Sequence, residues 1–383
     1  MRNMDFKKSE EQELLLESLK ELMERECPED YVRRCDEEGR FPVEFAKALV
    51  DNGFGLLGVP EEYGGTPVDL LTLLLVKEEI AKNGGPINVF TQAFQLDNML
   101  TYGSEEQKKI TMHYVKQGQV PFCIGFTEPQ AGSDTSAIQT TYTRRNGKVY
   151  LNGHKTFISG ALTNPYLLCM ARNCDETDKT KAFTMWWVPM SAPGIKVEQL
   201  HKIGWHMLET CEIYLENVEV EEKDIVGQEG HGFLQLMKNF ETERLLMAAT
   251  ILGMAECAFE DAVRYANQRV QFGKPIGTFQ LIQEKITYMA LKIENMRNLI
   301  YKTAWEKENG ISTQITSALT KLYCAQSGNE IIDDALQIMG GIGYTNDCRI
   351  SRLWRDARNY RIGGGTDQVM IHIAGRNILK KYR

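Results

Sequence analysis

The sequence predicts an α+β protein in which a β domain lies between two helical domains. Helical periodicity runs from residue 9 to about residue 119, short β-rich segments follow to about residue 220, and helical periodicity then returns to the end of the chain. Helices and strands therefore occur in separate blocks, unlike the βαβ alternation of a Rossmann enzyme. We expect domains at residues 1–120, 121–225 and 226–383.

The first block carries apolar residues at helical spacing. Leu15, Leu19 and Leu22 recur every three or four residues, as on the buried face of an amphipathic helix. "VEFAKALVDNG" predicts a helix that ends at Gly53, because glycine is favoured at helix C-termini. After the turn-rich "GVPEEYGG", "LLTLLLVKEEIA" predicts a further helix.

The middle block contains short segments rich in β-branched and aromatic residues, separated by Gly, Asn, Asp and Pro: "KVYLNGHKTFIS", "AFTMWWVPM", "GIKVEQL" and "CEIYLENVEV". In the last block, long periodic segments at 233–266 and 312–339 predict a helical bundle. The strands therefore form a unit of their own between the helical parts.

Composition narrows the class of ligand. A net charge of −8 and the lack of a Lys/Arg run argue against a nucleic-acid partner. No run of 18 apolar residues predicts a membrane span, and the charged start "MRNMDFKKSEEQ" is unlike a signal peptide, so we expect a cytoplasmic protein. Nine scattered cysteines without a CxxC pair, and six histidines without HExxH spacing, favour neither a disulfide framework nor a bound metal.

Two segments of the β block could contact a ligand. "GFTEPQAGSD" combines small residues, which let backbone amides approach a planar or anionic ligand, with the hydroxyls of Thr127 and Ser133. The same composition is typical of an ordinary turn. "HKTFISG" places Phe157 and Ser159 on one face of a strand. That pair suits a ring cofactor, and core packing is the alternative.

Three further segments, marked by glycines and one arginine, could contact a ligand. "NQRVQFGKPIGTFQLIQ" offers Arg269 to an anionic group, although Arg269 also fits a solvated helix end. In "ALQIMGGIGYT", a helix C-cap explains Gly340, and close approach of a ligand would explain Gly341. "RIGGGTDQVM" places three glycines directly before a predicted helix, again a backbone open to a ligand.

Glu243 lies on an apolar strip of a predicted helix, with Leu236, Phe240 and Met247. A carboxylate there is either paired or has a raised pKa, and a general acid or base near neutral pH requires a raised pKa. Arg244 has similarly apolar neighbours. The alternative is that the two residues satisfy each other inside the bundle.

In this order, "FTEPQAGSD", "LNGHKTFIS", "QRVQFGKPIGTFQ", "QIMGGIGYT" and "WRDARNYRIGGGT" resemble the acyl-CoA dehydrogenase family over essentially the whole chain. Within that family, "YTRRNGKVYLNG", "CAFEDAVRYANQRVQFG" and "FQLIQEK" are most similar to the bacterial crotonobetainyl-CoA reductase branch. The resemblance implies the fold predicted above, noncovalently bound FAD, a homotetramer built as a dimer of dimers, and an electron-transferring flavoprotein as redox partner.

The resemblance also implies roles for individual residues. Those matched to the flavin of the same subunit are Phe126, Thr127, Gly132, Ser133, Phe157 and Ser159, with Phe157 and Ser159 where the family usually has Trp and Thr. Those matched to the FAD of the neighbouring subunit are Arg269, at its pyrophosphate, with Phe272, Gln280, Gln337 and Gly341. Thr366 and Gln368 match contacts to the adenosine side of FAD, and the positions matched to acyl-CoA are Ser133, Arg244 and Gly365.

One departure concerns the catalytic base. Most family members carry it as the Glu of a "YEGT"-like segment, and here that position is Gly364. A smaller set carries the base on the long helix, just before a conserved Arg, and here that residue is Glu243. The resemblance therefore implies that Glu243 is the catalytic acid/base.

The predicted function is FAD-dependent interconversion of acyl-CoA and 2-enoyl-CoA, with a crotonobetainyl-CoA reductase-like enzyme as the first expectation. Two alternatives remain. One is a short or branched-chain acyl-CoA dehydrogenase that works in the oxidative direction. The other is an acyl-CoA-binding subunit without catalysis.

Overall fold

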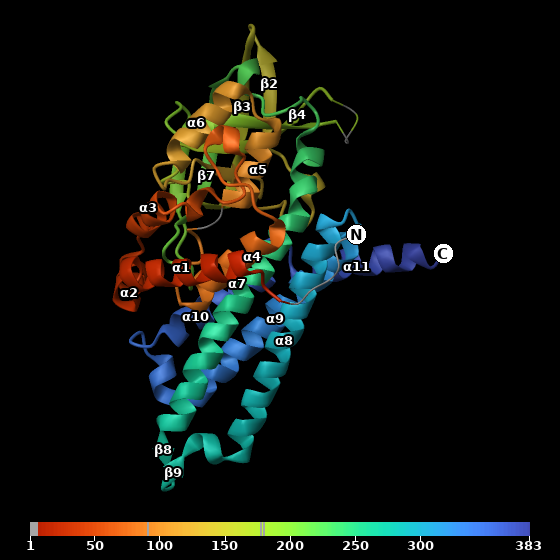
Figure 1. Cartoon of the computed structure of the whole chain (residues 1–383). Coiled ribbons are helices and arrows are strands. Elements are labelled where there is room, and N and C mark those ends of the chain that lie inside the picture. Colours follow the sequence, from red (N-terminus) through yellow and green to blue (C-terminus); the bar gives the residue numbers. More distant parts are fainter. Residues whose placement is uncertain (1–6, 90–91, 177, 179–180) are drawn as a thin grey trace.

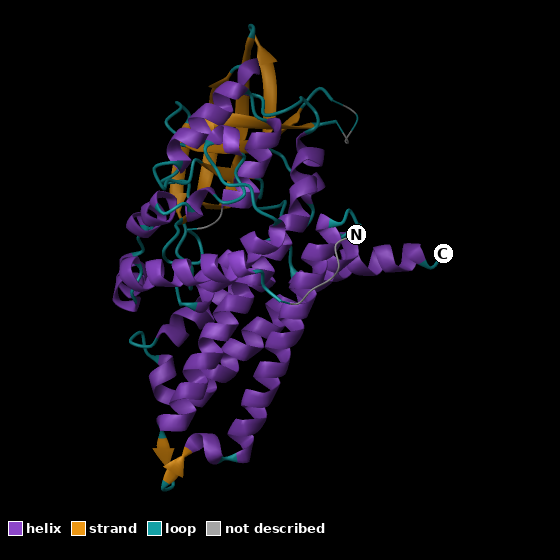
Figure 2. Cartoon of the chain, in the orientation of Figure 1, coloured by secondary structure: helices purple, strands orange, loops and turns teal. Residues whose placement is uncertain are grey.

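The computed structural model describes residues 7–89, 92–176, 178 and 181–383 (Figure 1). Helices form both ends of the chain and strands form its middle, so the predicted α+β fold is confirmed (Figure 2). The sheet domain lies at the top of the view, and the C-terminal helices extend below it (Figure 1).

The N-terminal helices are α1 (Glu10–Glu26), α2 (Glu29–Glu38), α3 (Val43–Asp51), α4 (Leu70–Lys82), α5 (Gln92–Tyr102) and α6 (Glu105–Val115). Ser9 begins α1 with a capping box in which its hydroxyl accepts from the backbone of Gln12. Leu19 and Leu22 of the predicted apolar stripe are buried. Helix α3 ends at Asp51, two residues before the predicted end at Gly53, and Gly53 adopts a φ of +84°.

The middle strands are β1 (Phe122–Gly125), β2 (Thr141–Arg145), β3 (Lys148–Ser159), β4 (Tyr166–Asn173), β5 (Phe183–Pro189), β6 (Ile195–Gln199) and β7 (Thr210–Val220). They pair in the order β1-β4-β2-β3-β7-β6, and β5 pairs with β4. The antiparallel register of β3 with β7 shifts between Lys155 and Ile158. This bulge is the local irregularity that presents Phe157.

The C-terminal helices are α7 (Gly232–Gln268), α8 (Gln280–Glu308), α9 (Gln314–Met339), α10 (Arg349–Ala357) and α11 (Asp367–Lys381). The first two are joined by a hairpin of β8 (Val270–Gln271) and β9 (Lys274–Pro275) at the foot of Figure 1. Helix α7 packs against α4 on one side and α9 on another, so both helical domains share one apolar core. Gly340 caps α9 with a φ of +63°, as its sequence predicts.

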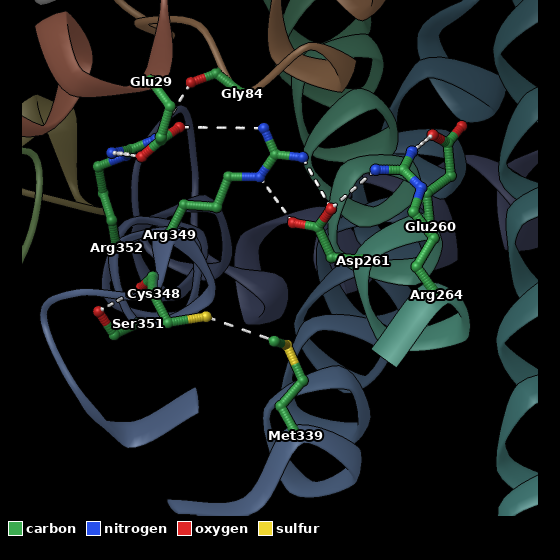
Figure 3. A network of polar contacts seen from close by, with 10 residues as sticks. All are labelled: Glu29, Gly84, Glu260, Asp261, Arg264, Met339, Cys348, Arg349, Ser351 and Arg352. Atoms are coloured by element: carbon green, nitrogen blue, oxygen red, sulfur yellow. Dashed lines mark hydrogen bonds and ion pairs between the residues drawn. The ribbon is translucent and has the colours of Figure 1, made fainter. Parts of the chain in front are cut away.

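Partly buried ion pairs hold α10 to distant parts of the chain (Figure 3). Arg349 donates two hydrogen bonds to Asp261 of α7, at 2.6 and 2.8 Å. Arg352 donates to Glu29 of α2 at 2.8 Å and to the carbonyl of Gly84 at 3.2 Å. Each guanidinium thus has a carboxylate partner, and α10 is held to the N-terminal domain and to α7.

Among the described residues, no helix is both long and apolar enough to cross a membrane. The same residues contain no group of three or more His, Cys, Asp or Glu arranged to hold a metal ion. All nine cysteines are free thiols, and most of them are buried.

Candidate active site

Glu243 places a carboxyl group in the interior between α7, α9 and the turn before α11. Its Oε2 atom is fully buried and has no hydrogen-bond partner within the described part of the chain. Burial raises the pKa of Glu243 to about 7, although the positive charges of Arg244 and Lys321 oppose that rise. Both its protonated and its ionised form are therefore accessible near neutral pH.

Glu243 and Arg244 do not form the self-satisfied pair that was the alternative. No hydrogen bond or ion pair joins them in the described chain, and the Nε atom of Arg244 is buried without a partner. Neighbours on a helix point about 100° apart, which accounts for the separation. Burial lowers the pKa of Arg244, despite the opposing charges of Glu243 and Glu241. Both side chains thus have polar atoms available to a bound molecule.

Gly364 lies directly opposite Glu243. A Cβ atom built on Gly364 would lie 3.9 Å from the carboxyl carbon of Glu243 and 2.3 Å from the Sδ atom of Met247. The φ of Gly364 is +60°, which other residues adopt at a cost. Glycine therefore fits here because of its positive φ and because a side chain would collide with Met247. Residues 243 and 364, the two positions at which the resemblance allows a catalytic base, are thus neighbours in space.

The turn that contains Gly364 presents backbone donors. The N–H of Gly363 donates to the carbonyl of Asn359 at 2.8 Å. Among the described residues, nothing accepts a hydrogen bond from the N–H groups of Gly364, Gly365 or Thr366. They stand at the start of α11, where the helix dipole favours negative charge. A carbonyl oxygen that gains charge during a reaction would be stabilised there.

Thr366 and Gln368 occupy the first turn of the same helix. The Thr366 hydroxyl accepts from the N–H of Val369 at 3.2 Å and so caps α11. Gln368 is exposed. Thr366 thus fixes the start of the helix that carries the free N–H groups.

The loop with Thr127, Gly132 and Ser133 is held by a buried ion pair. Lys155 donates to Glu128 at 2.8 Å, and both side chains are almost fully buried. Burial would raise the pKa of Glu128, but the Lys155 ammonium and backbone donors hold it below its usual value. The pair fixes one end of the loop, while Gly132 and Ser133 remain exposed.

Phe157 offers an aromatic face beside that loop. The N–H of Thr156 donates to the carbonyl of Thr127 at 3.0 Å, which joins the loop to the β3 bulge. Phe157 has a φ of +58°, a strained value for an aromatic residue, and its side chain is 68% exposed. Ser159, two residues on, is partly exposed with its Oγ 3.4 Å from the hydroxyl of Thr210. An exposed ring on strained backbone fits a flat ring ligand.

Phe126 links this region to α7. Its ring meets that of Phe240 edge-on, with centroids 6.4 Å apart, and Phe240 lies one helical turn before Glu243. The β-domain loop and the acidic residue are thereby positioned by one packed contact.

The other cofactor candidates lie at the opposite end of the bundle. Arg269 ends α7, Phe272 forms the hairpin turn with 93% of its surface exposed, and Gln280 begins α8. Gln337 and Gly341 lie at the end of α9, which runs back to the same end. A straight helix from Glu243 to Arg269 spans roughly 39 Å, so within one chain Arg269 lies far from the candidate acid/base.

Two features of the site are not predicted by the sequence. One is the Glu128–Lys155 pair, whose members are distant in the chain. The other is Lys321 on α9, which is 1% exposed and donates a hydrogen bond to the carbonyl of Gly365. Its signal was a lysine inside the small and apolar segment "SALTKLYCA".

Comparisons with known proteins give the same family, that of the acyl-CoA dehydrogenases, along nearly the whole chain. Three family models match consecutive parts of it, namely the acyl-CoA dehydrogenase N-terminal domain at residues 9–118, the middle domain at 123–218 and the C-terminal domain at 230–379. The chain is 56% identical over 381 residues to "Probable acyl-CoA dehydrogenase YdiO" of Escherichia coli K12, covering 99% of this chain and 100% of that protein.

Solved structures show the same similarity. Butyryl-CoA dehydrogenase from Megasphaera elsdenii is 30% identical with a TM-score of 0.88, over 98% of this chain and 100% of that one. A chain described under "Electron transferring flavoprotein of Acidaminococcus fermentans: Towards a mechanism of flavin-based electron bifurcation" is 31% identical with a TM-score of 0.90, again over 98% and 100%.

Proposed function

The chain belongs to the acyl-CoA dehydrogenase family, whose members are FAD-dependent flavoproteins, and we propose that it interconverts acyl-CoA and 2-enoyl-CoA with Glu243 as the acid/base. One observation carries the assignment. The Glu243 carboxyl, whose Oε2 atom is buried without a partner in the described chain, faces Gly364, beside backbone N–H groups that can bind a thioester oxygen. A proton acceptor and donors for the developing charge thus stand together.

In the oxidative direction, the Glu243 carboxylate removes the Cα proton of the thioester. The Gly365 amide donates a hydrogen bond to the thioester carbonyl, which stabilises the enolate character that develops as the proton leaves. FAD, when bound, supplies the acceptor of the hydride from Cβ. In the reductive direction, the protonated form of Glu243 returns a proton to Cα. A carboxyl group that changes form near neutral pH serves both directions.

We propose that two chains share each flavin. One chain contributes the loop and strand residues Phe126, Thr127, Gly132, Ser133, Phe157 and Ser159, with Thr366 and Gln368. The neighbouring chain contributes Arg269, Phe272, Gln280, Gln337 and Gly341. The exposed ring of Phe157 and the separation along α7 support this division. Ser133 and Arg244 would contact the acyl-CoA. The proposed assembly is a cytoplasmic homotetramer.

The proposed substrate is an enoyl-CoA like crotonobetainyl-CoA, reduced with electrons from an electron-transferring flavoprotein. The branch-specific segments of the sequence support the substrate, and the similarity to a chain described with such a flavoprotein supports the partner. The competing function is oxidation of a short or branched acyl-CoA. The direction depends on the free energy of the reaction and on the redox partner.

Anaerobic spectroscopy of the purified yellow protein tests this choice. The oxidised flavin is mixed with a panel of saturated acyl-CoAs, and the dithionite-reduced flavin is mixed with a panel of enoyl-CoAs that includes crotonobetainyl-CoA. Fast, selective reoxidation by crotonobetainyl-CoA supports the reductase. Selective bleaching by a short or branched acyl-CoA, with no preference for crotonobetainyl-CoA, supports the dehydrogenase. A flavin that responds to no thioester contradicts both and favours a binding subunit.

A further inference from the structure

Lys321 is a lysine in the interior of the C-terminal bundle. It lies on α9, is 1% exposed and is among the largest fully buried side chains of the described chain. Removing an ammonium group from water is costly unless it gains partners, and lysine is almost never fully buried without them. The partners of Lys321 therefore indicate what it does.

The Nζ atom of Lys321 donates to the carbonyl oxygen of Gly365. In a trans peptide, the C=O of Gly365 and the N–H of Thr366 point in opposite directions. Lys321 thus fixes the peptide plane from one side and directs the N–H of Thr366 to the other side. Gly364 and Gly365 have φ values of +60° and +97°, and such glycine backbone is conformationally free unless something holds it.

Lys321 also lies within electrostatic reach of charged groups on α7 and α11. These are Glu243 and Arg244 of α7 and Asp367 of α11. Burial lowers the pKa of Lys321 to about 8, opposed by Asp367 and Glu243 and reinforced by Arg244. The Oδ2 atom of Asp367 accepts from Arg361 at 2.8 Å and from Gln326 at 3.2 Å, while its Oδ1 atom is buried without a hydrogen-bond partner in the described chain. At neutral pH, the ammonium of Lys321 is thus a positive charge near the Glu243 carboxyl.

We propose that Lys321 is a positioning residue for the reaction at Glu243. Its ammonium holds the Gly365 carbonyl, and with it the Gly365–Thr366 peptide plane, so that the glycine turn keeps one conformation beside the thioester, and it places a positive charge near the Glu243 carboxyl. This role rests on the proposed function, because it requires Glu243 to be the acid/base. The role is distinct from catalysis, since the hydrogen bond of Lys321 goes to the backbone.

Lys321→Met keeps most of the side-chain volume and removes the charge. In the oxidative direction, the pH at which kcat/KM reaches half its maximum is expected to rise by about one unit, because the carboxylate loses a nearby positive charge. We expect kcat to fall at least about tenfold, because donors to a developing oxyanion contribute this much or more. Lys321→Arg retains the charge. Its kcat/KM is expected to rise with pH at the same pH as in the parent.

The control variant is Lys292→Met. Lys292 lies on α8 and pairs with Glu330 of α9, the helix of Lys321, at 2.7 Å. It is expected to leave the pH profile unchanged. Flavin content and thermal unfolding establish that each variant is folded. If Lys321→Met does not fold, Lys321→Gln is measured in its place.

A second measurement does not depend on turnover. The infrared band of a protonated carboxyl group is followed against pH, and Glu243→Gln identifies the part that belongs to Glu243. In Lys321→Met this band is expected to persist about one pH unit higher than in the parent. The same upward shift in the kinetic profile supports the inference.

The two hypotheses fail in different ways. If Glu243→Gln turns over like the parent, the acid/base assignment is wrong and the role of Lys321 falls with it. If Glu243→Gln is inactive while folded Lys321→Met keeps the parent's pH profile and infrared titration, the inference about Lys321 alone is overturned.

Discussion

Glu243 and Gly364, far apart in the sequence, face each other so closely that a Cβ on Gly364 would lie 3.9 Å from the Glu243 carboxyl carbon. A carboxyl group can reach this place from α7 or from the turn before α11, and a side chain on Gly364 would come within 2.3 Å of the Sδ atom of Met247. The chain uses α7 and leaves the turn without side chains.

Glu243→Gln is expected to slow anaerobic flavin reduction by acyl-CoA by roughly 10²–10⁴-fold, because glutamine cannot accept the Cα proton. FAD content and acyl-CoA binding should be retained, since the two side chains have nearly the same shape. Stopped-flow absorbance measures the rate. Glu260→Gln, on the exposed part of α7, is the matched control and should react like the parent. Bleaching of Glu243→Gln at the parent's rate would contradict the assignment.

The same substitution is expected to stabilise the protein above pH 7. The pKa of Glu243 is about 7 in the folded chain and near 4.5 in the unfolded chain, so folding disfavours its carboxylate. The parent therefore loses stability as the pH rises from about 4.5 through about 7. Glutamine does not titrate. In thermal unfolding, the melting temperature of Glu243→Gln should exceed that of the parent at pH 8. Below about pH 4.5 the two melting temperatures should be the same. An equal difference at both pH values would refute the explanation.

Gly364→Ala is expected to cost about 1–3 kcal/mol of stability, because it combines a positive φ with a contact that forces Met247 to move. Gly364→Glu should crowd the site further and reduce acyl-CoA turnover, since Glu243 already supplies the carboxyl group. The control is Gly375→Ala on α11, where an added Cβ meets nothing within 4 Å. Chemical unfolding and turnover measure both effects. Full activity in Gly364→Glu would show that the place can hold two carboxyl groups.

Glu128→Gln is expected to destabilise the protein by about 3–5 kcal/mol, because it leaves the Lys155 ammonium buried without its counterion. The loop at Thr127 should loosen, so bound FAD should fall as well. Unfolding in urea and the ratio of flavin to protein absorbance measure these losses. Glu219→Gln breaks the exposed pair with Lys148 in the same domain and should change neither quantity. Equal effects of the two variants would argue against a special role for the buried pair.

The sequence predicted those features that depend on neighbours in the chain. The helical stripe of Leu19 and Leu22, and the glycine cap at Gly340, follow from local periodicity and backbone conformation. Glu243 stood out because its helical neighbours are apolar, and the family resemblance then supplied its role and its relation to Gly364.

Features that depend on the meeting of distant segments escaped prediction. Glu128 and Lys155 meet only through the pairing of strands and loops, and Lys321 meets Gly365 only because α11 turns back onto α9. Simple alternation also gave no sign that Phe157 lies in a bulge with positive φ, because an extra residue in a strand leaves no local pattern.

The distance between Glu243 and Arg269 along α7 has a genetic consequence under the proposed sharing of the flavin. A chain damaged at Glu243 still carries an intact hairpin end, and a chain damaged at Arg269 still carries an intact acid/base. A dimer of the two would contain one wholly repaired site and one doubly defective site. Two null alleles of the gene could thus complement each other, although neither protein works alone.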